Sequence, residues 1–157
     1  MDRKNKIIRW GMLILWMGVI FFFSSQTGME SSRNNALILR ILSGMGIDLQ
    51  WMDSWVNMNL VIRKLAHIIG YFILATLWIR ALEDEGRSRA RTLLWAGIFS
   101  FLYACTDEWH QSFVPQRDPS FRDVLIDSVG ICLAILIRLR PFLWRGLGER
   151  SEKMVKD

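Results

Sequence analysis

The chain gathers many chemically active side chains into residues 103–130, which read YACTDEWHQSFVPQRDPSFRDVLIDSVG. This stretch holds carboxylates, a histidine, glutamines and arginines, and apolar sequence lies on both sides of it. Carboxylates and histidine can transfer protons or ligate a metal, whereas arginine can hold an anion such as a phosphate. The elements that carry these residues decide which of these chemistries the chain can perform.

The composition indicates a membrane protein. Hydrophobic residues make up 52% of the 157 residues, with 8 Trp and 9 Phe, which is rich for a soluble protein of this length. Several apolar segments approach the length of about 20 residues that a helix needs to cross a bilayer. They are residues 7–23, 65–82, 92–105 and 124–139. The last two reach that length only if the polar residues at their outer ends continue the helices. A soluble helical bundle is the alternative.

The 20 Lys and Arg residues predict the orientation of these helices. Loops on the cytoplasmic side of a membrane carry an excess of basic residues. Most of the basic residues here fall at the N-terminal end, at residues 80–91 and at residues 138–156. We therefore expect one membrane domain over residues 1–157 with both termini in the cytoplasm, where residues 1–6 and 141–157 form tails. The same bias accounts for the net charge of +5, so we expect no nucleic-acid partner.

The long connection between the first and second apolar segments predicts a further helix over residues 31–42. Leu37 and Ile41 recur there at helical spacing, and the segment is amphipathic. We expect this helix to lie on the outer membrane surface or to cap the bundle, with Trp51 and Trp55 at the level of the lipid headgroups. A fifth helix packed as ordinary core is the alternative.

Polar residues in the second, third and fourth spanning segments recur at spacings that place them on one face of each helix. The stripes are Lys64, His67 and Tyr71; Ser100, Ala104, Asp107, Glu108 and Gln111; and Asp123, Asp127, Gly130 and Ala134. In the last stripe the small residues Gly130 and Ala134, four positions apart, predict a close approach of a neighbouring helix. Because charged groups inside a membrane are expensive, such stripes face the bundle interior or a wet cavity. All of them lie toward the predicted outer end. We therefore expect a polar cluster that opens to the outside, with Arg117 folded over it from the turn.

These residues resemble the VanZ-like family of membrane proteins. The resemblance rests on FSSQ at residues 23–26, RKLAHIIGYFILA at residues 63–75 and DEWHQSFVPQRDPSFRDVLIDSVG at residues 107–130. The family pattern is similar to K-x-x-H-x-x-x-Y, D-E-x-x-Q-x-F-V-P-G-R and D-V-x-x-N-x-x-G. The chain departs from it at Gln116, where the family usually has Gly, and at Asp127, where it usually has Asn. The added carboxylate would tend to raise the pKa of a neighbouring group or to attract a cationic partner such as Lys64 or Arg117.

The resemblance implies an all-α, polytopic helical bundle in the bacterial plasma membrane, with four spanning helices and an interfacial helix after the first. It also implies a link to the cell envelope and to decreased sensitivity to lipoglycopeptide antibiotics such as teicoplanin. It gives no reaction, so the chemistry has to come from the site.

General acid/base chemistry and ligand binding are the two uses that the polar cluster suggests. Because adjacent helical residues diverge by about 100°, Asp107 and Glu108 cannot both point at one atom. The candidate catalytic residues are His67, Asp107, Glu108 and Asp123, and the candidate ligand-binding residues are Lys64, Tyr71, Gln111, Arg117 and Asp127. We interpret Arg63, Asp118 and Arg122 as surface residues. No motif for a metal or a cofactor is present, so we expect neither.

The leading hypothesis is a protein that binds, and could also modify, an amphiphilic or lipid-linked molecule in the outer leaflet. Its partners would be membrane lipids and a lipid-linked envelope precursor or a lipoglycopeptide. In this hypothesis, Lys64 and Arg117 neutralise an anionic head, and His67 with Asp107 or Glu108 orients it or transfers a proton. The alternative is a non-enzymatic membrane scaffold or regulator whose polar cluster only stabilises helix packing.

Overall fold

The described part of the chain folds into helices. The computed structural model describes the backbone of residues 3–47, 57–83, 87–118 and 120–156, and side chains in these ranges up to residue 140. The helices are α1 (Arg3–Ser24), α2 (Gly28–Gly44), α3 (Met58–Leu82), α4 (Arg89–Gln111) and α5 (Phe121–Lys156). The described ranges contain no strand, so the all-α prediction is confirmed.

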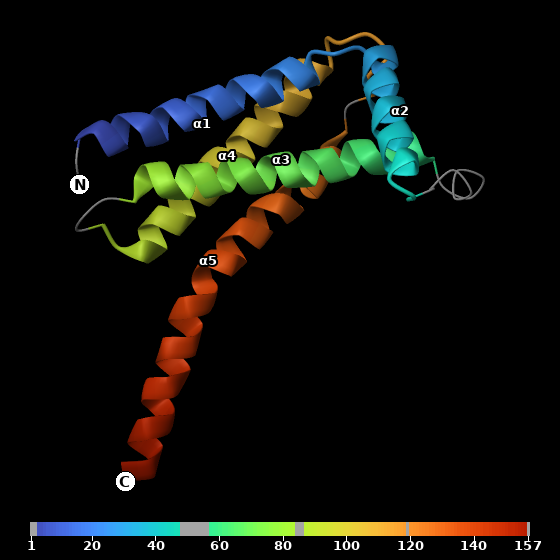
Figure 1. Ribbon diagram of the computed structural model, residues 1–157. Coiled ribbons are helices and arrows are strands. Elements are labelled where there is room, and N and C mark those ends of the chain that lie inside the picture. Colours follow the sequence, from blue (N-terminus) through green and yellow to red (C-terminus); the bar gives the residue numbers. More distant parts are fainter. Residues whose placement is uncertain (1–2, 48–56, 84–86, 119, 157) are drawn as a thin grey trace.

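The helices form a bundle with one transverse element (Figure 1). α1 and α3 run alongside each other, and α4 crosses them. α2 lies across the C-terminal end of α1 and the N-terminal end of α3. α5 packs mainly on α3 and α4, and its C-terminal part extends beyond the bundle (Figure 1). All four predicted apolar segments lie within helices. Within the described residues, α1 and α3 are long and apolar enough to cross a membrane, and spanning by α4 and α5 stays a prediction.

Side-chain caps fix where several helices begin. At the start of α2, the Thr27 hydroxyl accepts a bond from the Glu30 N–H, and the Glu30 carboxylate accepts one from the Thr27 N–H at 2.8 Å. This reciprocal pair satisfies two of the amides that a helix start leaves unpaired. Asn57 and Ser88 cap α3 and α4 in the same sense, each accepting a bond from a first-turn amide. α2 extends from Gly28 to Gly44, so the predicted bounds of 31–42 are too short at both ends.

α2 is not a core helix. Asn35 is its one buried residue, and its side-chain amide donates to the Asn59 carbonyl of α3 at 3.1 Å. Leu37 and Ile41 are more than half exposed. The alternative of a fifth buried helix is therefore wrong, while a position on the outer membrane surface stays a prediction. Trp51 and Trp55, which were expected at the headgroups, lie outside the described residues.

Helices α3 and α5 approach each other closely at Gly130 of α5. A Cβ atom at this position would lie 2.1 Å from the Ile68 carbonyl oxygen and 2.9 Å from the Phe72 nitrogen. The main chains of α3 and α5 therefore touch here, and only glycine fits. Ala134, one turn further along, is buried in the core. The predicted close approach at the small residues Gly130 and Ala134 is thus confirmed at Gly130.

Candidate functional site

Polar side chains from α1, α3 and α4 form a closed network at the end of the bundle next to α2. The Asp107 carboxylate accepts from the Ser24 hydroxyl at 2.9 Å and from the Gln111 amide at 3.1 Å. Arg63 donates to the Gln111 amide oxygen at 2.9 Å. Ser24, Asp107 and Gln111 are buried. These four residues, which we call the closed network, join three helices by hydrogen bonds, and this is the role that buried polar groups have in helix packing.

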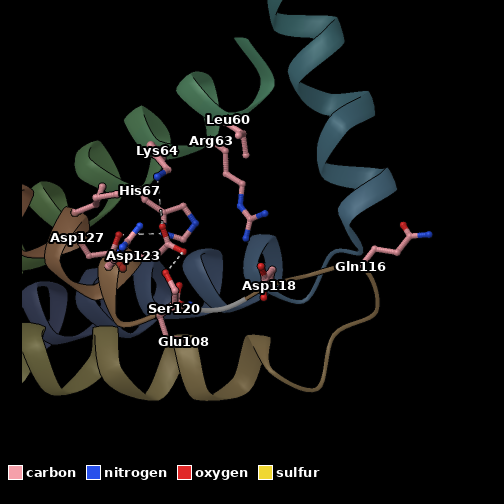
Figure 2. A pocket seen from close by; sticks show the side chains of 12 residues that line it. Leu60, Arg63, Lys64, His67, Glu108, Gln116, Asp118, Ser120, Asp123 and Asp127 are labelled. Carbon is pink, nitrogen blue, oxygen red and sulfur yellow. Dashed lines mark hydrogen bonds and ion pairs between the residues drawn. The ribbon is translucent and has the colours of Figure 1, made fainter. Parts of the chain in front are cut away.

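A polar cavity of about 410 Å³ lies beside the closed network, between α3, α4 and α5. Its most polar walls are Arg63, Lys64, His67, Glu108, Asp123 and Asp127. Figure 2 shows the α3 side chains facing the carboxylates of α5, with Glu108 rising from α4. The predicted divergence of two neighbours is seen here, because Asp107 faces α1 whereas Glu108 faces the cavity.

His67 and Asp127 form the most enclosed pair of the polar cavity. The His67 Nδ1 atom lies 3.1 Å from one Asp127 carboxylate oxygen. Asp127 is fully buried, and its other oxygen has no partner among the described residues. The Tyr71 ring stacks on the His67 ring with centroids 6.3 Å apart. Because Asp127 occupies Nδ1, the Nε2 atom is the nitrogen of His67 that a ligand could use, and a carboxylate behind a histidine fixes its orientation.

The remaining carboxylates of the cavity have partial partners. Glu108 accepts from the Ser120 N–H at 3.1 Å, and Asp123 accepts from the Ser120 hydroxyl at 3.2 Å. Lys64 lies 3.8 Å from Asp123, and its side chain is 49% exposed. The expected pairing of Asp127 with Lys64 or Arg117 is therefore wrong. Lys64 sits one helical turn too far out along α3 and meets Asp123 instead, which leaves His67 opposite Asp127.

Arg117 holds the turn between α4 and α5 against the end of α1. Its guanidinium donates to the Gln26 carbonyl at 2.9 Å and to the Phe23 carbonyl at 3.2 Å. Arg117 does not line the polar cavity, so the expectation that it folds over the whole cluster holds only for its α1 side. Burial and the nearby positive charge of Arg63 lower the pKa of Arg117 to about 10. It therefore keeps its charge at neutral pH.

The residue before Arg117 adopts a backbone conformation that favours glycine. Gln116 has a φ of 60°, in the left-handed region. Its carbonyl lies so close to Gly28 that a Cβ atom there would be 2.3 Å from the oxygen. This geometry explains why a Gly is expected at the position of Gln116, and why this departure from the family pattern costs conformational energy.

The sequence interpretation missed three residues of the polar cavity. Arg63, Asp118 and Arg122 line it, although we expected them at the surface. Arg63 lies four residues before His67, so helical spacing placed both on one face of α3. The signal was overlooked because long basic side chains near a membrane boundary usually extend to the headgroups.

No three His, Cys, Asp or Glu groups within the described part of the chain are placed to hold a metal ion together. The cavity therefore offers hydrogen-bond donors, acceptors and charges from its own side chains. Its size lies within the roughly 300–1,000 Å³ that small-molecule sites occupy.

An all-helical chain with two apolar helices long enough for a bilayer and a polar cavity at one end of the bundle has the features of a helical membrane protein. The profile of the family described as VanZ/LLP1 matches residues 9–144, and the chain belongs to this family. The resemblance drawn from the motifs is thereby confirmed. No match was found among curated proteins or among solved structures.

Proposed function

We propose that this protein binds an amphiphilic, lipid-linked molecule in the outer leaflet of the plasma membrane and thereby lowers sensitivity to lipoglycopeptides such as teicoplanin. Membership of the VanZ/LLP1 family supports a membrane protein of the teicoplanin-resistance type. The polar cavity is the single observation that carries the binding proposal. It brings residues of three helices together at one end of the bundle and leaves one Asp127 carboxylate oxygen without a partner among the described residues.

The side chains of the polar cavity suit a head group with both anionic and hydrogen-bonding parts. Arg63, Lys64 and Arg122 supply positive charge, and guanidinium groups hold phosphate oxygens in a bidentate manner. Glu108 and Asp123 supply acceptors for hydroxyl or amide groups on the same ligand. A lipid-linked envelope precursor combines these features, with a phosphate near the membrane and polar groups beyond it.

A proton-transfer step is the second use that this site supports. The His67 and Asp127 pair has the arrangement of a base oriented by a carboxylate, and Nε2 is left for a ligand. Modification of the bound molecule would use this pair, whereas binding alone would not need it. A purified protein that binds a lipid-linked precursor without changing it would limit the function to binding.

The scaffold alternative makes a different demand on the same residues. The closed network joins α1, α3 and α4, and the polar cavity adds two pairs between α3 and α5, namely His67 with Asp127 and Lys64 with Asp123. If the protein were only a scaffold, loss of a cavity side chain would act through folding alone.

The test is teicoplanin sensitivity of a susceptible bacterium that expresses the protein. We expect His67→Ala and Glu108→Gln to abolish the decrease in sensitivity while the amount of membrane-inserted protein stays constant. Glu83→Gln, at the C-terminal end of α3 and away from the polar cavity, is the matched control and should behave as the wild type. Protection that survives both cavity substitutions would leave the scaffold interpretation standing.

A further inference from the structure

A second hollow adjoins the polar cavity on the other side of α3. It has a volume of about 430 Å³, lies between α1, α2 and α3, and is lined mainly by apolar side chains. We call it the apolar groove. Arg63 and His67 line both hollows, so these two side chains form the boundary between them.

Each of the three helices turns one regular face toward the apolar groove. The lining residues include Trp16, Val19, Ile20 and Phe23 of α1, Ser31, Asn34, Asn35 and Ile38 of α2, and Ala66, Ile69 and Gly70 of α3. On α1 and α2 these follow the i, i+3, i+4, i+7 spacing of a single helical face. α1 and α3 supply the apolar walls, while α2 supplies mostly polar groups. The groove is therefore apolar along its length and polar under α2.

Direct contacts hold the walls of the groove together. The Trp16 indole donates to the Gly70 carbonyl at 3.0 Å, which ties α1 to α3 across the groove. A Cβ atom added at Gly70 would meet nothing within 4 Å. The groove thus has a hydrogen bond that fixes the distance between its walls, and beside this bond it has the open space that an acyl chain needs.

Two guanidinium groups stand at the polar end of the groove. Arg63 and Arg117 both line it, and within the described residues neither forms an ion pair with a carboxylate. Their observed hydrogen bonds go to neutral oxygens, namely the Gln111 amide and the carbonyls of Phe23 and Gln26. The Asp107 and Glu108 carboxylates lie near enough to act on Arg117 electrostatically, but they form no ion pair with it. Two neighbouring cations without a direct ion pair, beside a hydrocarbon-lined groove, are complementary to a lipid with an anionic head.

A buried hydroxyl at the same place also lacks a partner. The Tyr71 side chain is 1% exposed and lines the groove; its hydroxyl lies near the Asp107 carboxylate but makes no hydrogen bond of regular geometry within the described residues. A buried polar group without a partner is costly, and a bound ligand or water can satisfy it.

We propose that the apolar groove binds one acyl chain of a membrane lipid, and that Arg63 and Arg117 bind the phosphate of its head. The remainder of the head group then passes the boundary at His67 and enters the polar cavity. This inference rests on the proposed function, because the same molecule occupies both hollows. It adds the class of ligand, a lipid phosphate. It also places the acyl chain of the lipid in a site separate from that of the head group.

The test uses the purified full-length protein in neutral detergent and palmitoyl lysophosphatidylglycerol as the probe, with the dissociation constant measured by native mass spectrometry. Gly70→Leu places a side chain in the open space of the groove, and we expect it to weaken binding about ten-fold or more. Gly18→Leu is the matched control, because Gly18 is also an open helical position but does not line the groove. It should bind within about two-fold of the wild type.

Further variants keep the test independent of a folding defect. Ala66→Leu fills the groove one turn away and should weaken binding as well. Arg63→Gln should weaken the anionic probe about ten-fold and reduce its preference over palmitoyl lysophosphatidylcholine, whereas the exposed Arg33→Gln on α2 should change neither. Size-exclusion chromatography verifies that each variant is folded.

The outcomes separate this inference from the proposed function. If folded Gly70→Leu and Ala66→Leu both bind as the wild type while His67→Ala does not, the groove is not the chain site and the polar-cavity proposal stands. If glycerol phosphate binds as tightly as the lysolipid, the acyl chain contributes nothing and the inference is wrong. If teicoplanin binds with an affinity that falls in Gly70→Leu while the lysolipid does not bind, the occupant is the antibiotic and the lipid assignment is overturned. If the wild type binds no lysolipid, no precursor and no antibiotic, both proposals fail.

Discussion

The closed network and the polar cavity lie side by side and use the same kinds of residue, yet they differ in how completely those residues are bonded. In the closed network, Asp107 accepts two hydrogen bonds and Gln111 both donates and accepts. In the polar cavity, one Asp127 oxygen has no partner among the described residues and Lys64 is half exposed. Adjacent positions on α4, Asp107 and Glu108, belong to different regions.

This difference teaches which polar residues hold the fold and which remain for a ligand. A buried group that has all its hydrogen bonds contributes to packing and specificity, and replacing it leaves its partners unsatisfied. A group that lines a cavity and has unused hydrogen-bonding capacity can bond to a ligand when one binds. Residue type alone does not separate the two, because carboxylates occur in both regions. Substitutions can therefore be chosen to disturb one region and spare the other.

The largest effect is expected from Gly130→Ala, which should pull the polar cavity apart and spare the closed network. The added Cβ would meet the α3 main chain at 2.1 Å, so α5 must move away from α3 and carry Asp127 from His67. Such overpacking costs typically about 1–3 kcal/mol, and more when backbone is struck. Thermal unfolding of the detergent-solubilised protein should show a lower midpoint. Gly11→Ala, where the added atom meets nothing, is the control and should lose no stability.

The next largest effect distinguishes two neighbouring carboxylates. Asp107→Asn should destabilise the protein by about 1–3 kcal/mol, because the bonds from Ser24 and Gln111 then go to a neutral acceptor and the new amide NH₂ replaces the other carboxylate oxygen at a buried position. Glu108→Gln should leave the unfolding midpoint nearly unchanged, since an amide oxygen can still accept from the Ser120 N–H. The midpoints of the two variants are compared directly. Equal losses in both would show that the two regions are not distinct.

A smaller gain is expected from Gln116→Gly in the turn that borders both regions. A side chain in the left-handed region costs roughly 1–2 kcal/mol, and Gln116→Gly removes this strain. The greater conformational freedom of glycine in the unfolded chain offsets roughly 0.5–1 kcal/mol of that gain. The net stabilisation should therefore reach about 1 kcal/mol. Gln116→Asn, which tolerates this conformation better than Gln, should fall between the two. A lower unfolding midpoint for the Gly variant would contradict the explanation.

The smallest effect concerns α2, outside both regions, and depends on pH. The hydrogen bonds from the Thr27 N–H and then from its hydroxyl lower the pKa of Glu30 below its usual 4.5. Because the folded pKa is the lower one, the capping box stabilises α2 above the unfolded value and is lost as the pH falls through the folded value. The protection factors of the first α2 amides, which are exchange rates corrected for the intrinsic effect of pH, should decrease at acidic pH in the wild type. In Glu30→Gln, which has no carboxylate to titrate, this decrease should be absent.

Helical spacing was sufficient to predict much of this arrangement from the sequence. Because residues three and four apart share a helix face, His67 and Tyr71 could be placed with the carboxylates of α4 and α5 before any coordinates. The spacing could not predict which side chains pair across the helices, because that depends on the position of each helix along the axis of its neighbour. The contact at Gly130 sets that position for α5 and puts Asp127 opposite His67. Arg63 was missed because the sequence does not tell whether a boundary arginine turns outward or inward.

The pairing of His67 with Asp127 has a consequence for how the chain is assembled during synthesis. The two residues are 60 positions apart, so α3 leaves the ribosome long before its partner helix exists. Until α5 arrives and packs at Gly130, His67 and Lys64 stand without the carboxylates that face them in the finished bundle. Docking of α5 is therefore the step that completes the molecule. A chain truncated ahead of Asp127 is expected to expose these groups, and membrane proteases that remove orphaned polar helices should degrade it.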